Sequence, residues 1–237
     1  MSKTDGRSLL RAFTLVELLV VIVIVGVLAA IASSAWRGAQ ERARSARCAG
    51  KLKTLGGGIH LYAQDHDGDF PRSLHSAGVA REPGWVLSVA PYLGVPKTRS
   101  IAEWQLYFNR LFRCPNDKMT DVNIPSYGLN VFFELTPDGD DYEGSPATWR
   151  KVMQVPTPSR TILLAETRPV AFGDHVMCHQ WAGPAAAKNA LSHDRHSKMA
   201  NYLFVDGHVE RLPSEATFAP KKGTDLWNPS KANAVRP

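Results

Sequence analysis

The sequence predicts an α+β protein in which a long N-terminal helix packs on a small antiparallel β-sheet. Three observations support this fold class. An uninterrupted apolar segment lies near the N-terminus, an apolar stripe with helical spacing follows it, and short strand-like segments with turn signals occupy the C-terminal half. The 237 residues suffice for one anchoring helix and one globular domain of ordinary size.

The N-terminal apolar segment is long enough to cross a membrane. The 19 residues from Leu18 to Trp36 carry no charge. At about 1.5 Å per residue they form a helix of roughly 28 Å, close to the thickness of a bilayer core. Glu17 is a lone carboxylate at the start of this segment, where a charge is costly unless it meets a partner. An α-amine created by cleavage just before Phe13 would be such a partner.

Residues 11–17, Arg-Ala-Phe-Thr-Leu-Val-Glu, resemble the N-terminal signal of type IV prepilins and type II secretion pseudopilins. In that family a prepilin peptidase cuts after a small residue and methylates the new amine. The resemblance therefore implies cleavage between Ala12 and Phe13 and N-methylation of Phe13. Glu17, the fifth residue after the cut, would register the subunit in a growing filament. The family usually has glycine where this chain has Ala12.

The resemblance implies a type IV pilin-like fold and a structural role rather than an enzymatic one. It divides the chain into a cleaved leader (1–12), a transmembrane and assembly helix (13–36), a periplasmic continuation of the helix (37–65), a globular pseudopilin-like head (66–215) and a loosely ordered tail (216–237). One span would hold the precursor in the inner membrane, with its C-terminal domain in the periplasm or, after assembly, at the cell surface. Its partners would be prepilin peptidase and other subunits of a type II secretion pseudopilus or type IV pilus-like filament.

Three other interpretations of the apolar segment fit the residues less well. A secretory signal peptide has an apolar core of about 7–15 residues. Residues 29–32, Ala-Ala-Ile-Ala, could supply its cleavage site, but Glu17 and the length of the segment argue against it. A plain transmembrane anchor explains the length but not the Phe-Thr-Leu-Val-Glu sequence, and a buried helix of a soluble protein explains neither.

The positive charge of the chain does not indicate a nucleic-acid partner. The formal net charge is +6, and much of the excess follows the apolar segment directly, at Arg37, Arg42, Arg44, Arg47, Lys51 and Lys53. Next to a bilayer such a block contacts lipid headgroups or acidic neighbours, and the sequence has no RNA- or DNA-binding motif. The positive-inside rule places the more basic flank of a membrane helix in the cytoplasm, whereas the prepilin motif places this block outside. Because prepilin-like proteins insert with their leader inside, we give the motif precedence.

The helix is expected to continue beyond the membrane segment. Apolar residues recur there at steps of three and four: Ala39, Ala43, Ala46, Ala49, Leu52, Leu55, Ile59 and Tyr62. This stripe predicts that the second half of the helix packs on a sheet. Residues 56–58 are three glycines, and each costs about 1 kcal/mol relative to alanine in a helix interior. We therefore predict a kink or local unwinding at this point.

Shorter elements are predicted downstream. Ser100 and Glu103 have the spacing of a capping box and open a helix that ends near Phe112. Strands are expected over residues 126–135, 161–165, 201–205 and 208–212. The last two flank Asp206-Gly207, which predicts a hairpin with a type I′ turn.

A second resemblance lies in this C-terminal half. His196, nine residues and then Asp206-Gly207 resemble the His-x9-Asp-Gly domain of a large bacterial group of prepilin-like proteins. Stretches that agree with that group lie at 48–65, 112–115, 126–130 and 158–162. The resemblance implies no established chemistry. Gly207 can supply the positive φ of the turn and Asp206 can cap it. His196 is expected to hydrogen-bond near the turn, and a ligand or metal role for His196 is the alternative.

Three cysteines are too few for a disulfide scaffold. In an oxidising periplasm we favour pairing of Cys48 with Cys114, because each borders a segment expected to meet at the base of the helix. Closing this loop of 66 residues would contribute about 4 kcal/mol. The alternative is that all three cysteines, including Cys178, stay reduced.

No catalytic residues and no cofactor are predicted. Calcium is considered at two acidic clusters and zinc at one set of residues. Asp65, Asp67 and Asp69 could bind calcium, since hard cations prefer clustered carboxylates, but their spacing is not that of an EF-hand. An acidic, solvated turn is the alternative, and the acidic residues of 138–141 form a second such loop. A zinc site could draw on Asp174, His175, Cys178, His179, His193 and His196. Adjacent Cys178 and His179 fit joint ligation poorly.

Two functions from other classes remain open. A membrane-anchored cell-surface module could use the prepilin signal only for export and bind a glycan or a calcium-dependent ligand. Its candidate binding residues are the acidic loops and Trp85, Trp104, Trp149 and Trp181, although tryptophans are more often core or interface residues. A zinc hydrolase is the third class. The sequence lacks the Gly-x-Ser-x-Gly pattern of a serine nucleophile.

Overall fold

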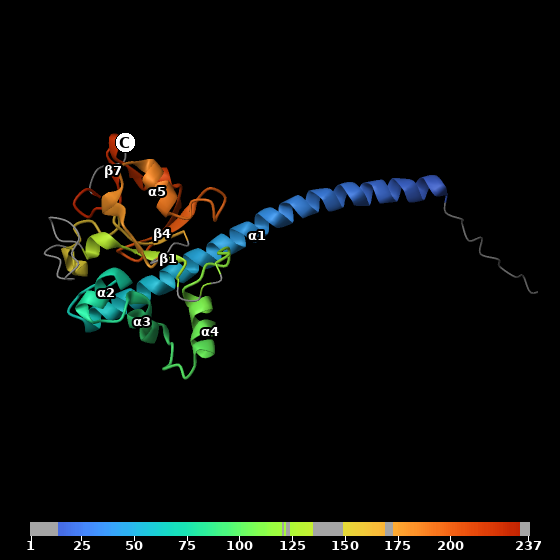
Figure 1. Ribbon diagram of the computed structural model, residues 1–237. Helices are drawn as coiled ribbons and strands as arrows, with labels where there is room; N and C mark the ends of the chain where they lie inside the picture. The colour runs from blue at the N-terminus through green and yellow to red at the C-terminus, as the bar shows by residue number, and fades with distance from the viewer. Residues whose placement is uncertain (1–13, 120, 122–123, 135–148, 169–172, 233–237) are drawn as a thin grey trace, which may run out of the picture. The chain divides into compact units, whose positions relative to one another are not determined.

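The computed structural model describes residues 14–119, 121, 124–134, 149–168 and 173–232 (Figure 1). Ala12, Phe13 and the acidic loop of residues 138–141 lie outside the described residues. The chain divides into two compact units, Met1–Arg42 and Ala43–Pro237, which are described separately below.

The first unit consists, in its described part, of the beginning of helix α1, which runs from Leu15 to Asp65. Among the described residues, α1 is the one helix that is long and apolar enough to cross a membrane. The apolar window of α1 has no buried residue. Its side chains are apolar all round rather than on one stripe, which is the pattern of a membrane span and not of a surface helix.

The second unit, Ala43–Pro237, is called the head below, and it is built on a five-stranded sheet with the strand order β3-β1-β2-β4-β5. The strands are β1 (Tyr127–Asn130), β2 (Ile162–Glu166), β3 (His175–Val176), β4 (Ala200–Phe204) and β5 (Val209–Leu212). The pairs β1–β2, β2–β4 and β4–β5 are antiparallel. The pair β1–β3 is parallel. The predicted α+β class is confirmed, but the sheet is mixed because the short strand β3, which the sequence analysis missed, joins its edge.

The second half of α1 packs on one face of this sheet. Leu52, Leu55 and Ile59 are fully buried and belong to one core cluster with Leu164 and Leu203 of β2 and β4. The opposite face carries a second cluster, which includes Ile162, Ala165, Tyr202, Phe204, Ala187 of α5 (Pro184–Ala190) and Trp227. The residues Tyr202, Leu203 and Phe204 of β4 alternate between the two clusters, whereas β2 has a bulge between Ile162 and Leu164. Both faces of the sheet are buried, which places the sheet in the middle of the unit.

Further short elements surround the sheet. They are the α-helices α2 (Leu74–Ala80), α3 (Trp85–Val89) and α4 (Ile101–Leu111), six 3-10 helices (Ala90–Leu93, Val131–Phe133, Val152–Gln154, Cys178–Gln180, Ser214–Ala216 and Pro220–Lys222), and a two-stranded sheet of β6 (Phe218–Ala219) and β7 (Thr224–Asp225). α4 is the helix predicted after Ser100. Ser100 Oγ accepts a hydrogen bond from the Glu103 amide at 3.2 Å, as a helix cap should.

The glycines at 56–58 do not break α1, which is helical through all three positions. Two of them allow close packing instead. A Cβ atom at Gly58 would lie 2.6 Å from Leu93 and 2.8 Å from Val89, and one at Gly56 would lie 3.0 Å from Leu203. At Gly57 a Cβ would meet nothing within 4 Å. The predicted local unwinding was wrong because the tight contacts of the head outweigh the low helix propensity of glycine.

The segment after residue 216 is not a loose tail up to residue 232, which corrects the predicted domain division. Leu226, Trp227 and Ala232 are buried. The carbonyl of Leu226 accepts a 2.8 Å hydrogen bond from the amide of Ile162, and the carbonyl of Trp227 accepts one of 2.8 Å from Asn130 Nδ2. The sequence lacked helical or strand periodicity here because the elements of this segment, β6, β7 and the 3-10 helix Pro220–Lys222, are only two or three residues long.

The β4–β5 hairpin is present, but its turn differs from the predicted type. The amide of Gly207 donates to the carbonyl of Phe204 at 2.9 Å, and the amide of Phe204 donates to the carbonyl of His208 at 2.9 Å. The connection therefore has three residues, and Gly207, with φ of 87°, is its one position with positive φ. This pattern is a type I turn followed by a left-handed residue rather than a two-residue type I′ turn.

Candidate functional site

The start of α1 forms a reciprocal capping box between Thr14 and Glu17. The Thr14 hydroxyl accepts a hydrogen bond from the Glu17 amide at 3.2 Å. Glu17 Oε2 in turn accepts from the Thr14 amide at 2.9 Å and from the Thr14 hydroxyl at 2.7 Å. A capping box satisfies backbone N–H groups that the first helical turn leaves unpaired. It also holds the Glu17 carboxylate at the N-terminal end of the helix, beside Thr14, the residue that follows Phe13 in the sequence.

The apolar side chains that follow are exposed in the isolated chain. Their exposed fractions run from 47% at Val20 to 80% at Leu15, and Ile31 is 63% exposed. A contiguous apolar surface of this length cannot remain in water, because soluble monomers rarely expose apolar patches of more than a few hundred Å². The surface therefore requires lipid or other protein around it.

A second site lies in the head, where four side chains with metal-binding or redox chemistry meet. Cys48 of α1 and Cys114, after α4, form a disulfide with a Cα–Cα distance of 5.3 Å, which is the pair favoured from the sequence. His196 Nε2 lies 3.4 Å from Cys114 Sγ and 3.0 Å from Glu166 Oε1. All four residues are buried, His196 and Glu166 completely. Sequence reasoning named three of them but gave no signal for Glu166.

His196 takes its position from a tight turn that precedes β4. Ser197 and Lys198 have φ of 55° and 65°, and the Met199 amide donates to the His196 carbonyl at 3.2 Å. Two successive left-handed residues closed by this bond have the signature of a type I′ turn. Non-glycine residues pay a conformational cost in this region. The turn geometry predicted for Asp206-Gly207 thus occurs nine residues earlier, and it directs His196 toward Glu166.

His196 does not contact the Asp206-Gly207 turn, because the two lie at opposite ends of β4. Asp206 acts locally, as expected from its residue type. Its Oδ1 accepts a hydrogen bond from the amide of His208 at 3.1 Å and lies 2.6 Å from Nδ1 of the same residue. The His-x9-Asp-Gly spacing therefore corresponds to the length of β4 with its flanking turns, and its residues do not form a single site.

The predicted zinc residues are not gathered. His175 Nδ1 contacts Asp174 Oδ1 at 2.9 Å, and His193 Nδ1 lies 3.0 Å from the carbonyl of Lys188. Cys178 is buried with its thiol 3.1 Å from Asn130 Oδ1, and burial raises the pKa of this thiol. Within the described part of the chain, one group of three or more potential ligands is found, and His196 is its sole member from the predicted set.

The three aspartates considered for calcium each have another partner. Asp65 Oδ2 accepts from the Tyr92 hydroxyl at 2.9 Å. Lys151 Nζ pairs with Asp67 and lies 3.9 Å from Asp69. The hydrogen bond and the charge of Lys151 lower the pKa of the exposed Asp67 carboxyl. Nearby cations therefore neutralise most of this acidic turn.

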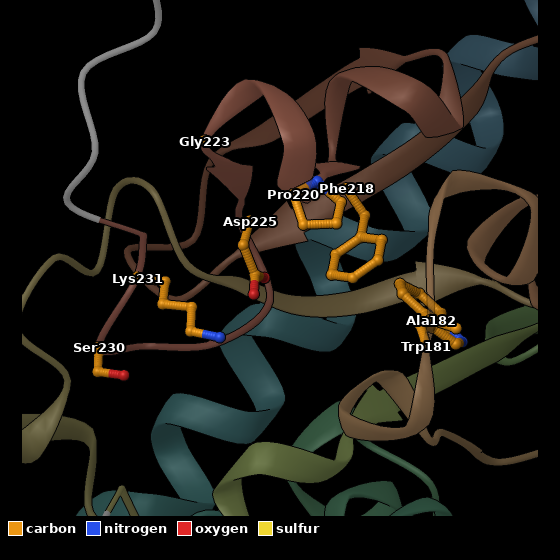
Figure 2. A pocket seen from close by; sticks show the side chains of 8 residues that line it. All are labelled: Trp181, Ala182, Phe218, Pro220, Gly223, Asp225, Ser230 and Lys231. Atoms are coloured by element: carbon orange, nitrogen blue, oxygen red, sulfur yellow. The ribbon is translucent and has the colours of Figure 1, made fainter.

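Of the tryptophans considered for ligand binding, Trp85 is fully buried in the core, whereas Trp181 lines a surface pocket. Figure 2 shows this pocket of about 630 Å³, with the rings of Trp181, Phe218 and Pro220 opposite the polar side chains of Ser230 and Lys231. Trp181 packs edge-on against Phe218, with ring centroids 5.3 Å apart. An aromatic wall opposite polar groups suits a small ligand with both apolar and hydroxylated faces.

Comparison with known proteins identifies the N-terminal motif. Residues 9–33 match the family described as the prokaryotic N-terminal methylation motif. No curated protein and no solved structure matches the chain. The chain thus carries a prepilin-type methylation motif on the helix that could span a membrane, and this match indicates a processed, pilin-like protein rather than an enzyme.

Proposed function

We propose that the chain is a pilin-like structural subunit that prepilin peptidase cleaves between Ala12 and Phe13, and that the mature subunit assembles through α1 into a type II secretion pseudopilus or type IV pilus-like filament. The observation that carries the proposal is the coincidence of two features. The methylation motif at residues 9–33 overlaps the exposed apolar part of the candidate membrane helix.

The exposed apolar surface gives the subunit two alternative environments. In the membrane, lipid covers the side chains of residues 18–36. In a filament, the helices of neighbouring subunits would cover the same side chains. Lipid tails are as apolar as leucine, so moving from lipid to a helix bundle gains little from the hydrophobic effect. Assembly must therefore draw on packing and on specific polar contacts.

Glu17 is the residue best placed to provide such a polar contact. Cleavage before Phe13 would create an α-amine next to Thr14. A carboxylate has two oxygens and about four acceptor positions, so the bonds from Thr14 to Glu17 leave capacity for the amine of an adjacent subunit. In a low-dielectric surrounding, pairing of these opposite charges is strongly favoured over leaving either charge alone. This pairing would set the axial position of one subunit against the next.

The mass of the N-terminal peptide tests the proposal. We expect a peptide that starts at N-methyl-Phe13 in protein recovered from membranes, and the same peptide in material sheared from the cell surface. Ala12→Gly should be cut at least as fast as the natural chain, while Ala12→Leu should block cleavage. An intact leader in every fraction, or efficient processing of Ala12→Leu, would contradict the assignment.

The pocket at Trp181 favours a second candidate, in which the head binds a glycan and the prepilin signal serves only for export. Aromatic rings opposite hydroxyl, carboxylate and amine groups can stack on a sugar and bind its hydroxyls. The full chain in detergent should then bind glycans as a monomer. Trp181→Ala should abolish that binding, and Trp36→Ala in the anchor should leave it unchanged. Absence of monomeric binding would remove this candidate.

A further inference from the structure

The geometry points to a metal site in the head: in the reduced protein, Cys48, Cys114, His196 and Glu166 bind one zinc ion. The disulfide and the metal are then two alternative states of the same buried cluster. One potential ligand atom from each of the four residues is present, and these atoms all lie within 4.8 Å of one another. This inference is independent of filament assembly and concerns the head alone.

The donor set and its spacing fit zinc. Zinc takes four tetrahedral ligands from thiolate, imidazole and carboxylate groups, with bonds of about 2.0–2.3 Å, so neighbouring ligand atoms lie about 3.3–3.8 Å apart. His196 Nε2 is already 3.4 Å from Cys114 Sγ and 3.0 Å from Glu166 Oε1. The main change that a tetrahedral site requires is separation of the two sulfurs, which follows once their bond is reduced.

Four separate elements hold the ligands in place. Cys48 lies on α1, Cys114 follows α4, Glu166 ends β2, and His196 sits on the turn before β4. A structural zinc ion contributes folding energy by tying together the elements that carry its ligands. Each ligand is buried in the packed head, so the backbone around the site is fixed before any metal binds.

The surroundings of Glu166 are unusual for a core. A fully buried carboxylate is costly unless it is paired or coordinates a metal. In the disulfide state, Glu166 Oε2 accepts from the Asn201 amide at 3.0 Å, and Oε1 contacts His196. Opposite Glu166 in the β1–β2 ladder is Tyr127, whose buried hydroxyl has no hydrogen-bond partner among the described residues. A cluster with this much buried polarity fits a metal centre better than an apolar core.

The exchange between the two states balances with a dithiol as reductant. The dithiol gives two electrons and two protons to the Cys48–Cys114 disulfide and itself becomes a disulfide. Zinc then displaces the two thiol protons, which leave to solvent. His196 must bind through an unprotonated Nε2, so its ring proton resides on Nδ1. Asn116 Nδ2 now lies 3.3 Å from Nδ1 and donates to the Arg195 carbonyl at 3.0 Å. A half-turn of that amide would present its oxygen to the Nδ1–H group, at the loss of the bond to Arg195.

The first test measures zinc in the full chain purified in detergent. Protein treated with dithiothreitol and zinc, then freed of both under anaerobic conditions, should retain one zinc per chain by mass spectrometry. Protein that was oxidised first should retain less than a tenth as much. Cobalt in place of zinc should give the charge-transfer absorption of thiolate ligands in the reduced sample alone. Reduced, folded protein without stoichiometric metal and without this absorption would overturn the proposal.

Variants then assign the ligands. His196→Gln and Glu166→Gln should weaken retention at least tenfold, the effect expected when a metal loses a ligand. Cys178→Ser, which alters the third buried cysteine outside the cluster, should keep one zinc per chain. If the ligand variants do not fold, the comparison of reduced with oxidised wild type still decides. Equal zinc content in wild type and in a Cys48→Ser/Cys114→Ser double variant would assign the metal elsewhere and refute the site.

Discussion

The two halves of helix α1 share one backbone conformation but differ completely in burial. In the first half, Leu18 and Ile22 are 58% and 60% exposed, whereas Leu52 and Ile59 in the second half are fully buried. The second half finds its partners within the chain, on the face of the sheet. Among the described residues of its own unit, the first half has no such partners, and it must find them in lipid or in other subunits. The comparison shows that one helix can serve two different purposes.

The two halves should therefore fail in different ways when they are altered. Changes at the start of α1 should act on processing and assembly and leave the stability of the head unchanged. Changes in the second half, or in the elements that pack on it, should alter the free energy of unfolding of the head and leave N-terminal processing unchanged. The four predictions below test this separation, from the largest expected effect to the smallest.

The largest effect is expected for Glu17→Ala. Removing one member of a buried charge pair costs about 2–5 kcal/mol, which corresponds to more than a tenfold loss of affinity between subunits. We expect at least tenfold less protein in the sheared surface fraction, with the same amount in the membrane fraction. Quantitative immunoblots of both fractions measure this ratio.

Two further variants show whether the charge is responsible. Glu17→Gln keeps the size and a carbonyl acceptor for the Thr14 cap but loses the charge, so it should assemble as poorly as Glu17→Ala. Glu41→Gln changes the next carboxylate along the same helix and should assemble normally. A normal yield of sheared filament from Glu17→Ala would mean that the motif is read by the peptidase alone.

The second effect concerns the disulfide that ties the buried half of α1 to the segment after α4. The Cys48–Cys114 bond closes a loop of 66 residues, and loss of such a constraint costs about 4 kcal/mol on the chain-entropy model. With a chelator present, reduction should lower the urea concentration at which half of the head is unfolded. Tryptophan fluorescence measures this midpoint. Cys178→Ser should respond to reduction as the natural chain does. Equal midpoints before and after reduction would show that the bond adds nothing to stability.

The third prediction uses neighbouring glycines as a matched pair. Gly58→Ala would place a methyl group 2.6 Å from Leu93, and overpacking of this kind costs about 1–3 kcal/mol. Gly57→Ala meets no neighbour within 4 Å and should stabilise the head by up to about 1 kcal/mol through helix propensity. Urea unfolding of both variants should give shifts of opposite sign. Shifts of the same sign would mean that the close approach at Gly58 is relaxed in solution.

Much of the fold follows from patterns within single segments. The apolar stripe on α1, the cap at Ser100 and the hairpin at Asp206-Gly207 all depend on neighbours a few residues apart. The structure has the cap and the hairpin, and it buries the stripe from Leu52 onward. The predicted stripe residues Ala39, Ala43 and Ala46 are exposed. The connections between distant segments could not be foreseen in the same way. β3 is two residues long, and the packing of Trp227 depends on where the sheet brings Asn130, so neither leaves a periodic signal.

The buried cluster in the head shows the same limit. Cysteine and histidine attract attention in any sequence, so Cys48, Cys114 and His196 were named from their residue types. Glu166 was not, because a single glutamate after a strand is indistinguishable from a solvent-exposed one until the sheet is assembled. The positive φ values at Ser197 and Lys198 were also unforeseen, since serine and lysine rarely adopt this conformation. Sites made by tertiary contacts are therefore found late, even when most of their members are recognised early.

The smallest effect compares the caps of two helices, one in each unit. At the start of α1, Glu17 reaches back to the amide of its own cap residue, Thr14. At α4, Glu103 instead accepts from the amide of Arg99 at 2.7 Å, one residue before the cap.

The hydrogen bond from the Glu103 amide to Ser100 Oγ is 3.2 Å long and exposed. Ser100→Ala should therefore lower the free energy of unfolding of the head by about 1 kcal/mol in urea, and Ser100→Asp should restore that stability. Neither variant should alter N-terminal processing. If Ser100→Ala reduced processing or filament yield as Glu17→Ala does, the stability of the head and the use of the anchor would be coupled, and the separation drawn from the two halves of α1 would not hold.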